Sequence, residues 1–283
     1  MADALLTWGW QGLALLVFLA LSVGSFLNVV IYRFPVMLER QWQSQAREVL
    51  EQPPVAGERF NLVVPRSRCP QCEAPIGPTQ NVPVLSWVLL NGRCHNCAAA
   101  IPARYPIVEL LTAMLTVAVV AKFGYTWLGA AIIAYTWALI ALTFIDYDTQ
   151  LLPDQITLPL VWLGLTINMF GGLVDLPSAV IGAMMGYLFL WATYWGFKLI
   201  TGKEGMGYGD FKLFAAIGAW VGWQLLPAAI LVACVAGLAY ALASSLTGKR
   251  ESAQPIPFGP FLAVAGWVAV LARDTLLAWF LPS

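Results

Sequence analysis

The sequence predicts an all-α polytopic membrane protein with about eight transmembrane helices and a small water-exposed insert between the first two. Hydrophobic residues make up 60% of the 283 residues and charged residues only 11%, whereas about a quarter of a soluble domain is charged. The mean hydropathy is +0.74. The net charge is zero, so bulk charge does not indicate an acidic partner. This composition excludes a disordered chain, a cytosolic globular enzyme and a nucleic-acid binder.

The predicted spans follow the runs that lack Asp, Glu, Lys and Arg, because a helix needs about 20 apolar residues to cross the hydrocarbon core. The longest run, 213–248, would form a helix of roughly 54 Å, so we divide it at the Gly and Pro of 222–227. The N-terminal run has no basic residue before it, so we expect no signal-peptide cleavage. The predicted spans are 10–32, 106–123, 127–146, 155–173, 178–200, 210–222, 225–247 and 257–279.

Basic residues predict the orientation of the chain. All but two of the 15 Lys and Arg residues lie in 33–105, 147–154, 198–212 and 248–256. Loops rich in Lys and Arg stay in the cytoplasm, so we expect the N-terminus outside it. The excess of Arg over Glu in the insert 33–105 fits control of topology better than recognition of particular lipids.

Two Cys-x-x-Cys pairs in the insert predict a zinc site. They are Cys69-Pro-Gln-Cys72 and Cys94-His-Asn-Cys97, and two such turns supply the four thiolates of a tetrahedral zinc ion. Disulfide bonds are the alternative, but this segment is predicted to face a reducing cytoplasm. A closed four-sulfur site has no position for a water nucleophile, so we expect a structural zinc that stabilises the insert.

Two further residues have chemistry that this site does not require. His95 is the only histidine, but a complete set of four sulfurs leaves no need for it as a ligand. Cys234 lies within a predicted span and is expected to be a small core residue.

The few other acidic residues gather at the predicted inner ends of the spans. Asp146 and Asp148 end the third span, Asp154 opens the fourth, and Asp210 opens the sixth. Charged groups near bilayer depth are costly and usually face a cavity or a partner. We therefore expect these two clusters, far apart in the sequence, to meet in the fold.

Two aspartates brought together favour acid–base catalysis. They cannot both ionise cheaply, and a pair that holds one proton can activate water and protonate a leaving amine. The sequence has no GxSxG or HExxH motif and no second histidine. Gly207 and Gly209 would let an extended substrate lie close to Asp210. Structural alternatives stay open: Asp148 and Asp154 as helix caps or solvated groups, and Asp210 as an N-cap beside the counter-charge of Lys212.

Together these motifs resemble the type 4 prepilin peptidase family, the bifunctional leader peptidases and N-methyltransferases, over nearly the whole chain. The resemblance rests on the two Cys pairs and on the segments 24–35, 81–87, 104–109, 145–154 and 205–212. It implies three parts: a first transmembrane helix (1–32), a cytoplasmic insert with a four-Cys zinc site (33–105), and a transmembrane aspartic peptidase core (106–283).

The resemblance also implies an activity. Asp146 and Asp210 match the family's catalytic pair, acting at the cytoplasmic face of the bacterial inner membrane. The implied substrates are prepilins of type IV pili or pseudopilins of type II secretion, cut after the Gly that ends a short basic leader. The hydrophobic stretch beyond the cut would stay in the lipid. The new N-terminal residue, typically Phe, would then be N-methylated with S-adenosylmethionine.

The methyl-donor site is less defined by the sequence. No Gly-rich nucleotide loop is present, so Asn28 and Glu109 are candidates for binding S-adenosylmethionine, with an inter-helix hydrogen bond as the alternative role. A peptidase without methyltransferase activity is the alternative function. A transporter is disfavoured, because carrier sites tend to lie near the midplane between inverted repeats.

Overall fold

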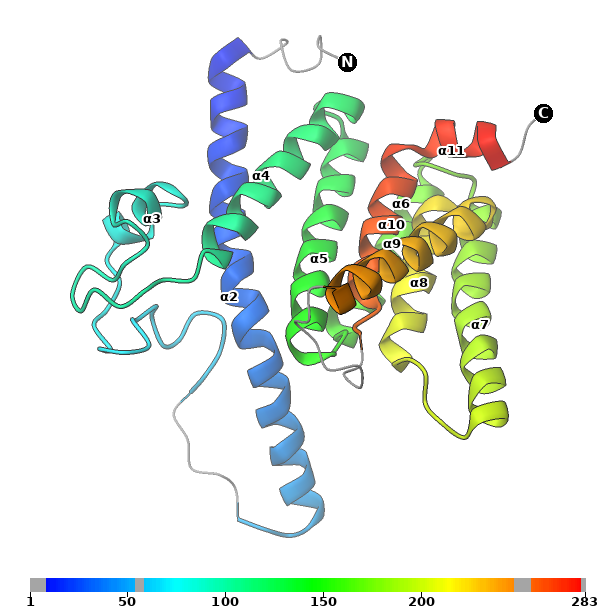
Figure 1. Ribbon diagram of the computed structural model, residues 1–283. Coiled ribbons are helices and arrows are strands. Elements are labelled where there is room, and N and C mark those ends of the chain that lie inside the picture. The colour runs from blue at the N-terminus through cyan, green and yellow to red at the C-terminus, as the bar shows by residue number, and fades with distance from the viewer. Residues whose placement is uncertain (1–8, 54–58, 247–255, 281–283) are drawn as a thin grey trace. The chain divides into compact units, whose positions relative to one another are not determined.

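The computed structural model describes residues 9–53, 59–246 and 256–280, and the regular structure in these ranges is helical (Figure 1). The helices are α2 (Gly9–Val49), α3 (Leu85–Leu89), α4 (Arg104–Phe123), α5 (Trp127–Thr149), α6 (Asp154–Met169), α7 (Leu176–Thr201), α8 (Tyr208–Val221), α9 (Leu226–Leu246), α10 (Gly259–Leu271) and α11 (Arg273–Phe280). Two short 3-10 helices cover Pro78–Asn81 and Trp223–Leu225. Within the described ranges the only β pairing is two isolated bridges, so the predicted all-α class is confirmed.

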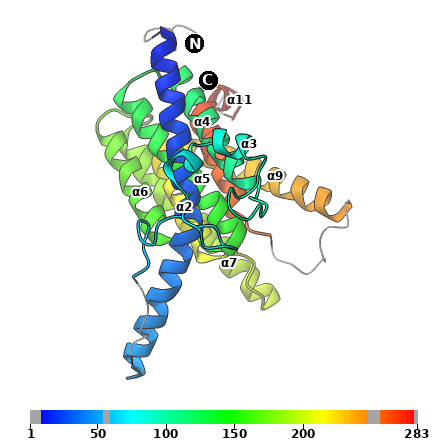
Figure 2. The same cartoon turned by 90° about the vertical axis from the view of Figure 1, so that its left-hand side faces the viewer.

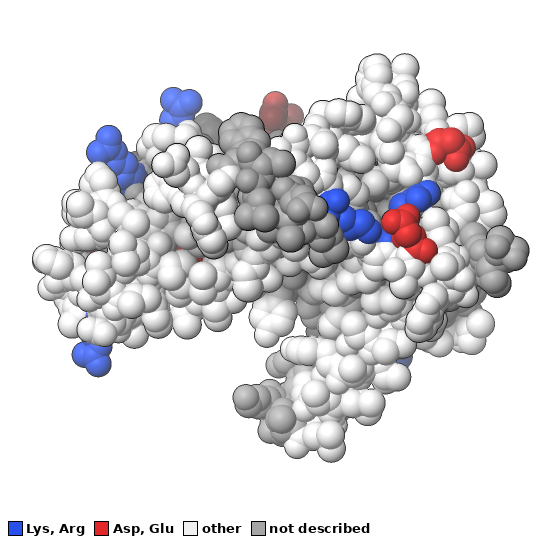
Figure 3. Space-filling model, turned by 90° about the horizontal axis from the view of Figure 1, so that it is seen from above, with Lys and Arg blue, Asp and Glu red and all other residues white. Residues whose placement is uncertain are grey.

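Each of the eight predicted spans is helical, but not all are long enough to cross a membrane alone. Five segments are long and apolar enough to cross a membrane: α2, α4, α5, α7 and Trp223–Leu246. The helices α6 and α8 have 16 and 14 residues, roughly 24 and 21 Å, against a core of about 30 Å. The eighth segment is a pair, α10 and α11, bent by 91°. Charged side chains are few and scattered over the face in Figure 3. The chain is a multi-pass membrane protein.

Packing divides the chain into two compact units, Met1–Tyr125 and Thr126–Ser283. This division differs from the predicted boundaries after residues 32 and 105, which followed the pattern of charge. In the first unit α4 packs against α2, so the insert is bracketed by two helices of one unit. Its two ends are therefore held by the same helix pair.

The first helix does not end where its apolar run ends. The run stops at Arg33, yet α2 continues through Pro35 to Val49 (Figure 2). The charged extension is rich in Glu, Arg and Gln, which are good helix formers. The end of an apolar run marks the exit from hydrocarbon, whereas helix hydrogen bonds continue in water. The predicted span therefore marks the end of the apolar run, and the helix itself continues beyond it.

Close approach of α2 and α4 requires a glycine. A Cβ built on Gly24 would lie 2.6 Å from the Glu109 Cα. Small residues at such crossings let two helix backbones come together. The buried Asn28 amide donates to the Tyr105 carbonyl at 3.1 Å, which ties the two helices together at the same level.

The second unit is built around α8, which packs against α6, α7 and α10. A Cβ on Gly182 would overlap the backbone of Gly218, so α7 and α8 touch backbone to backbone. Trp220 is fully buried, and its indole N–H donates to the Leu160 carbonyl of α6 at 3.0 Å. These contacts hold α8 firmly, and its first turn carries Asp210.

Candidate active site and candidate metal centre

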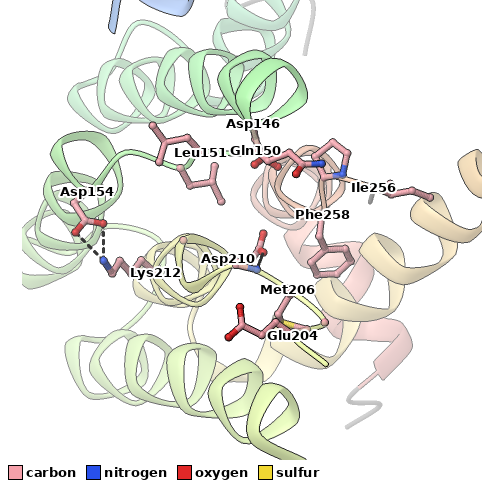
Figure 4. Close-up of a pocket in the computed structure, with 15 residues that line it drawn as sticks. Asp146, Gln150, Leu151, Asp154, Glu204, Met206, Asp210, Lys212, Ile256 and Phe258 are labelled. Carbon is pink, nitrogen blue, oxygen red and sulfur yellow. Dashed lines mark hydrogen bonds and ion pairs between the residues drawn. The ribbon is translucent and has the colours of Figure 1, made fainter. Parts of the chain in front are cut away.

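A cavity of about 400 Å³ lies within the second unit (Figure 4). Its walls come from the end of α5, the connection to α6, the connection from α7 to α8, and the segment before α10. The lining residues are Asp146, Gln150, Leu151, Leu152, Asp154, Glu204, Gly205, Met206, Gly207, Gly209, Asp210, Lys212, Ile256, Pro257 and Phe258.

Asp146 lies in the last turn of α5 and is 5% exposed. Its Oδ2 accepts a hydrogen bond of 3.0 Å from the backbone N–H of Gly259, the first residue of α10. A Cβ on Gly259 would lie 2.6 Å from that same oxygen. Any larger residue at 259 would therefore force the Asp146 carboxylate to move.

Asp210 is the third residue of α8 and is 6% exposed. Its Oδ2 accepts from the Gly207 N–H at 3.1 Å. Gly207 is the N-cap residue of α8, so Asp210 makes the back-reaching bond of a capping box and is not the N-cap considered from the sequence. The other oxygen, Oδ1, is buried and has no hydrogen-bond partner among the described residues. The cap uses one oxygen and leaves the second for other chemistry.

The two aspartates come from different helices and face one cavity. They are 64 positions apart in the sequence, and Figure 4 shows both carboxyl groups directed into the space between α5, α8 and the segment before α10. The expected meeting of the two acidic clusters is therefore found at these positions. Their catalytic role stays a prediction.

The other acids of these clusters are placed differently. Asp154 also lines the cavity, but both of its oxygens accept from the Lys212 ammonium, at 2.6 and 2.7 Å. Lys212 is thus the counter-charge of Asp154 rather than of Asp210. Asp148 is exposed and is not among the lining residues.

Two parts of the cavity wall were not predicted from the sequence. Glu204 lies on the loop between α7 and α8 and accepts from Lys198 at 2.8 Å. This hydrogen bond lowers the pKa of Glu204 below its usual value. The segment Ile256–Phe258, with the N–H of Gly259 behind it, forms the opposite side. The run Pro257-Phe-Gly-Pro260 was the only signal for it.

The lining limits the chemistry that the cavity can support. The described part of the lining contains no Ser, Cys or His, so no described residue of the wall is such a nucleophile. Four carboxyl groups and one ammonium face it, and only Asp154 is paired with that ammonium. Acid–base activation of water is the reaction type that these groups fit.

The four cysteines of the insert come together in the first unit. The sulfurs of Cys69, Cys72, Cys94 and Cys97 all lie within 4.8 Å of one another, and those of Cys69 and Cys97 are 3.8 Å apart. A tetrahedral ion with Zn–S bonds of about 2.3 Å separates its sulfurs by about 3.8 Å. The donor set therefore fits a metal ion of this kind. His95 is exposed and lies outside the cluster.

The two cysteine turns are copies of one structure. In the first turn the Cys69 N–H donates to the Ala74 carbonyl at 3.0 Å, and the Glu73 N–H donates to the Cys69 carbonyl at 3.0 Å. The matching bonds of the second turn run from Cys94 to Ala99 at 2.8 Å and from Ala98 to Cys94 at 2.9 Å. The pattern Arg-Cys-x-x-Cys-x-Ala-x-Ile occurs at 68–76 and again at 93–101, a short repeat that the sequence analysis overlooked.

Hydrogen bonds to two of the four sulfurs favour the thiolate form that binds metal. The Asn96 amide lies 3.6 Å from the Cys72 sulfur, and with the Ala74 N–H it lowers the pKa of Cys72 to about 6. The N–H groups of Cys97 and Asn96 lower the pKa of Cys94 in the same way. Thiolates, not thiols, are the metal ligands.

Asn28 and Glu109, the candidates for the methyl donor, are both buried in the first unit. The Asn28 amide donates to the Gly24 and Tyr105 carbonyls, so the alternative role, an inter-helix hydrogen bond, is present. Glu109 Oε2 accepts from the Val84 N–H at 2.7 Å and ties the insert to α4. Glu109 also accepts a hydrogen bond from the Ser25 side chain. These polar contacts are made within the protein, and a cofactor role for either residue stays a prediction.

A multi-pass membrane protein with a carboxyl-lined cavity fits the class of membrane hydrolases. Sequence comparison identifies the family within that class. The chain belongs to the type IV leader peptidase family. The model of that family matches residues 133–242, and the model of the bacterial peptidase A24 N-terminal domain matches residues 18–123. The two matched regions fall in the two compact units.

Curated relatives cover almost the whole chain. A protein of Aeromonas salmonicida is 54% identical over 97% of this chain and 95% of its own length. One of Stutzerimonas stutzeri is 54% identical over 93% and 91%, and one of Pseudomonas aeruginosa is 50% identical over 94% and 92%. All three are named prepilin leader peptidase/N-methyltransferase. No solved structure matches the chain significantly.

Proposed function

We propose that this protein removes the leader peptide of prepilins or pseudopilins by hydrolysis at the Asp146–Asp210 cavity, and then N-methylates the new N-terminal residue. The observation that carries the proposal is that two buried aspartates from α5 and α8 line one cavity. The names of the relatives support both activities. The distribution of Lys and Arg supports a cytoplasmic position for the cavity in the bacterial inner membrane.

The hydrogen bonds suggest how one proton is shared. Asp146 accepts from Gly259, and an N–H donor favours a carboxylate. Asp210 also accepts one N–H bond, from Gly207, but its second oxygen is buried without a donor among the described residues, and such an oxygen is less costly when it carries a proton. We therefore assign the ionised state to Asp146 and the protonated state to Asp210.

Hydrolysis follows from this assignment. Asp146 takes a proton from water while the water oxygen attacks the scissile carbonyl carbon, and Asp210 gives its proton to the carbonyl oxygen. When the tetrahedral diol collapses and the C–N bond breaks, Asp146 passes its proton to the leaving amine. Asp210 recovers a proton from the diol hydroxyl, so both side chains return to their starting states.

The four-cysteine cluster is proposed to hold zinc in a structural role. Cys69, Cys72, Cys94 and Cys97 complete a tetrahedral set, and the bound ion would hold the two turns together. S-adenosylmethionine is proposed as the methyl donor. Because the polar contacts of Asn28 and Glu109 are made to other groups of the protein, we derive no methyl-transfer step through them.

The test uses the purified full-length protein in detergent with a full-length prepilin and S-adenosylmethionine. Intact-mass measurement should show loss of the leader and then the gain of one methyl group at the new N-terminus. Cleavage without methylation would support the alternative, a peptidase that lacks methyltransferase activity. An uncleaved prepilin in the presence of a folded enzyme would contradict the proposal.

A further inference from the structure

The connection between α5 and α6 places one apolar side chain against both aspartate-bearing walls of the cavity. Leu152 lies in this connection, is 7% exposed and lines the cavity. A Cβ built on Gly209 would lie 2.6 Å from the Leu152 Cβ, so the leucine packs directly on the backbone beside Asp210. The leucine side chain has no polar group, so its role must come from packing.

The same leucine also reaches the group that orients the other aspartate. A Cβ built on Gly259 would lie 3.2 Å from the Leu152 Cδ1, and the Gly259 N–H is the donor to Asp146. Leu152 is therefore held between two glycine backbones, one next to Asp210 and one bonded to Asp146. Each glycine leaves room that any other residue would take from the leucine.

The connection is anchored next to the leucine. Asp154, two residues further on, is paired with Lys212 of α8. Pro153 precedes α6 with an extended backbone and restricts the chain between Leu152 and Asp154. Leu152 is thus held in place by its neighbours in the chain as well as by its contacts. A residue that sets the distance between two other groups must be held in this way.

We propose that Leu152 is a positioning residue that sets the separation and tilt of Asp146 and Asp210 by packing between Gly209 and Gly259. This inference rests on the proposed peptidase function. Packed interiors relax only partly when a side chain is truncated. Removal of the Leu152 isopropyl group, whose Cδ1 packs near both Gly209 and Gly259, therefore lets α8 and the start of α10 shift toward each other. A misplacement of about 1 Å at a catalytic group costs up to about 100-fold in rate.

The test compares kcat and KM for prepilin cleavage by the full-length protein. Leu152→Ala is expected to lower kcat by about 10- to 100-fold with KM changed less than about twofold. Leu152→Met keeps the volume and should restore kcat to within about threefold of the wild type. The matched control is Leu160→Ala in α6, a leucine 4% exposed that is not among the lining residues; it should lose stability but keep kcat.

A second variant changes the glycine that contacts Leu152. Gly209→Ala places a methyl group against Leu152 and should also lower kcat. Because both changes alter one packing contact, the effects of Leu152→Ala and Gly209→Ala should not multiply in the double variant. If Leu152→Ala instead raises KM at unchanged kcat, the leucine is a substrate contact and the inference is wrong.

The outcomes separate the inference from the proposed function. A wild-type protein that does not cleave prepilin contradicts the proposed function. A wild-type protein that cleaves, together with a Leu152→Ala variant that behaves like Leu160→Ala, contradicts only the positioning role. Independent, multiplicative effects of Leu152→Ala and Gly209→Ala would also overturn it.

Discussion

The cysteine cluster and the aspartate cavity are both built from short motifs, but in opposite ways. The four cysteines lie within residues 69–97, and each pair shares one turn that closes its own hydrogen bonds. The aspartates belong to two helices, and the donor to Asp146 comes from a third. A site made by local turns is largely determined by its own segment, whereas a site made by helix packing depends on the whole unit. The two sites should therefore fail independently.

The largest expected effect is in the cavity. Asp146→Asn or Asp210→Asn should lower cleavage by about 100- to 10,000-fold, because general acid–base catalysis contributes effects of this size. Leader loss is followed by intact-mass measurement. Metal content should not change, since no cysteine is altered.

The matched control is Asp148→Asn. Asp148 lies two residues after Asp146 on α5, is exposed, and is not among the lining residues. This variant should cleave at the wild-type rate. Equal losses for Asp146→Asn and Asp148→Asn would indicate damage to the helix end rather than to an acid–base pair.

The next effect concerns the metal. Cys72→Ser removes one of four thiolates and should abolish stoichiometric zinc binding, because structural zinc sites contribute on the order of 10 kcal/mol. Zinc is measured by mass spectrometry of the purified protein, and opening of the insert by limited proteolysis. Cys234 lies outside the cluster and is exposed on α9, so its expected place in the core is wrong. Cys234→Ser should keep the zinc.

Addition of a chelator tests whether the cysteine cluster and the aspartate cavity act independently. If the zinc is structural, the initial rate of cleavage should stay within about twofold after chelator is added, with a slower decline as the insert unfolds. Cleavage that stops at the moment of mixing would mean that the metal takes part in hydrolysis. The cysteine cluster and the aspartate cavity would then not act independently.

A smaller effect tests the methyl-donor assignment. Glu109→Gln keeps an acceptor for the Val84 N–H but loses the charge, so methylation should fall about tenfold or more while cleavage stays unchanged. Both products are resolved in one mass spectrum. Thr112→Val is the control, because the Thr112 hydroxyl is bonded only within its own helix. Equal methylation by Glu109→Gln and wild type would remove Glu109 from the site.

The smallest expected effect is at the rim of the cavity. The Asp154–Lys212 pair is partly exposed, with side chains 49% and 27% accessible, and such pairs contribute roughly 0.2–1 kcal/mol. Asp154→Asn should therefore slow cleavage by no more than about fivefold. A loss as large as that of Asp210→Asn would make Asp154 a member of the catalytic set.

Much of this molecule could be predicted from the sequence, for identifiable reasons. Uncharged runs located the eight helical segments, because lipid and internal hydrogen bonding constrain them strongly. The Cys spacing located the metal cluster, because both ligands of each pair lie on one turn. The two acidic clusters were located because acids are rare in this chain and lie at helix ends, whereas the choice of Asp146 and Asp210 within them came from the family resemblance.

Other features could not be predicted because they arise from packing between distant segments. Nothing near Gly259 in the sequence indicates that its N–H reaches Asp146. Leu152 looks like an ordinary apolar residue until its two glycine neighbours are known. The extension of α2 to Val49 was missed because charge marks the membrane boundary and not the end of the helix.

The most direct test of the central claim is an experimentally determined structure of the Asp146→Asn variant with an uncleaved prepilin bound. The account predicts the scissile carbonyl between residue 146 and Asp210, with the Asp210 carboxyl within about 3 Å of the carbonyl oxygen or of one bridging water. A leader junction bound at another site, with Asp210 out of reach of the scissile bond, would contradict it.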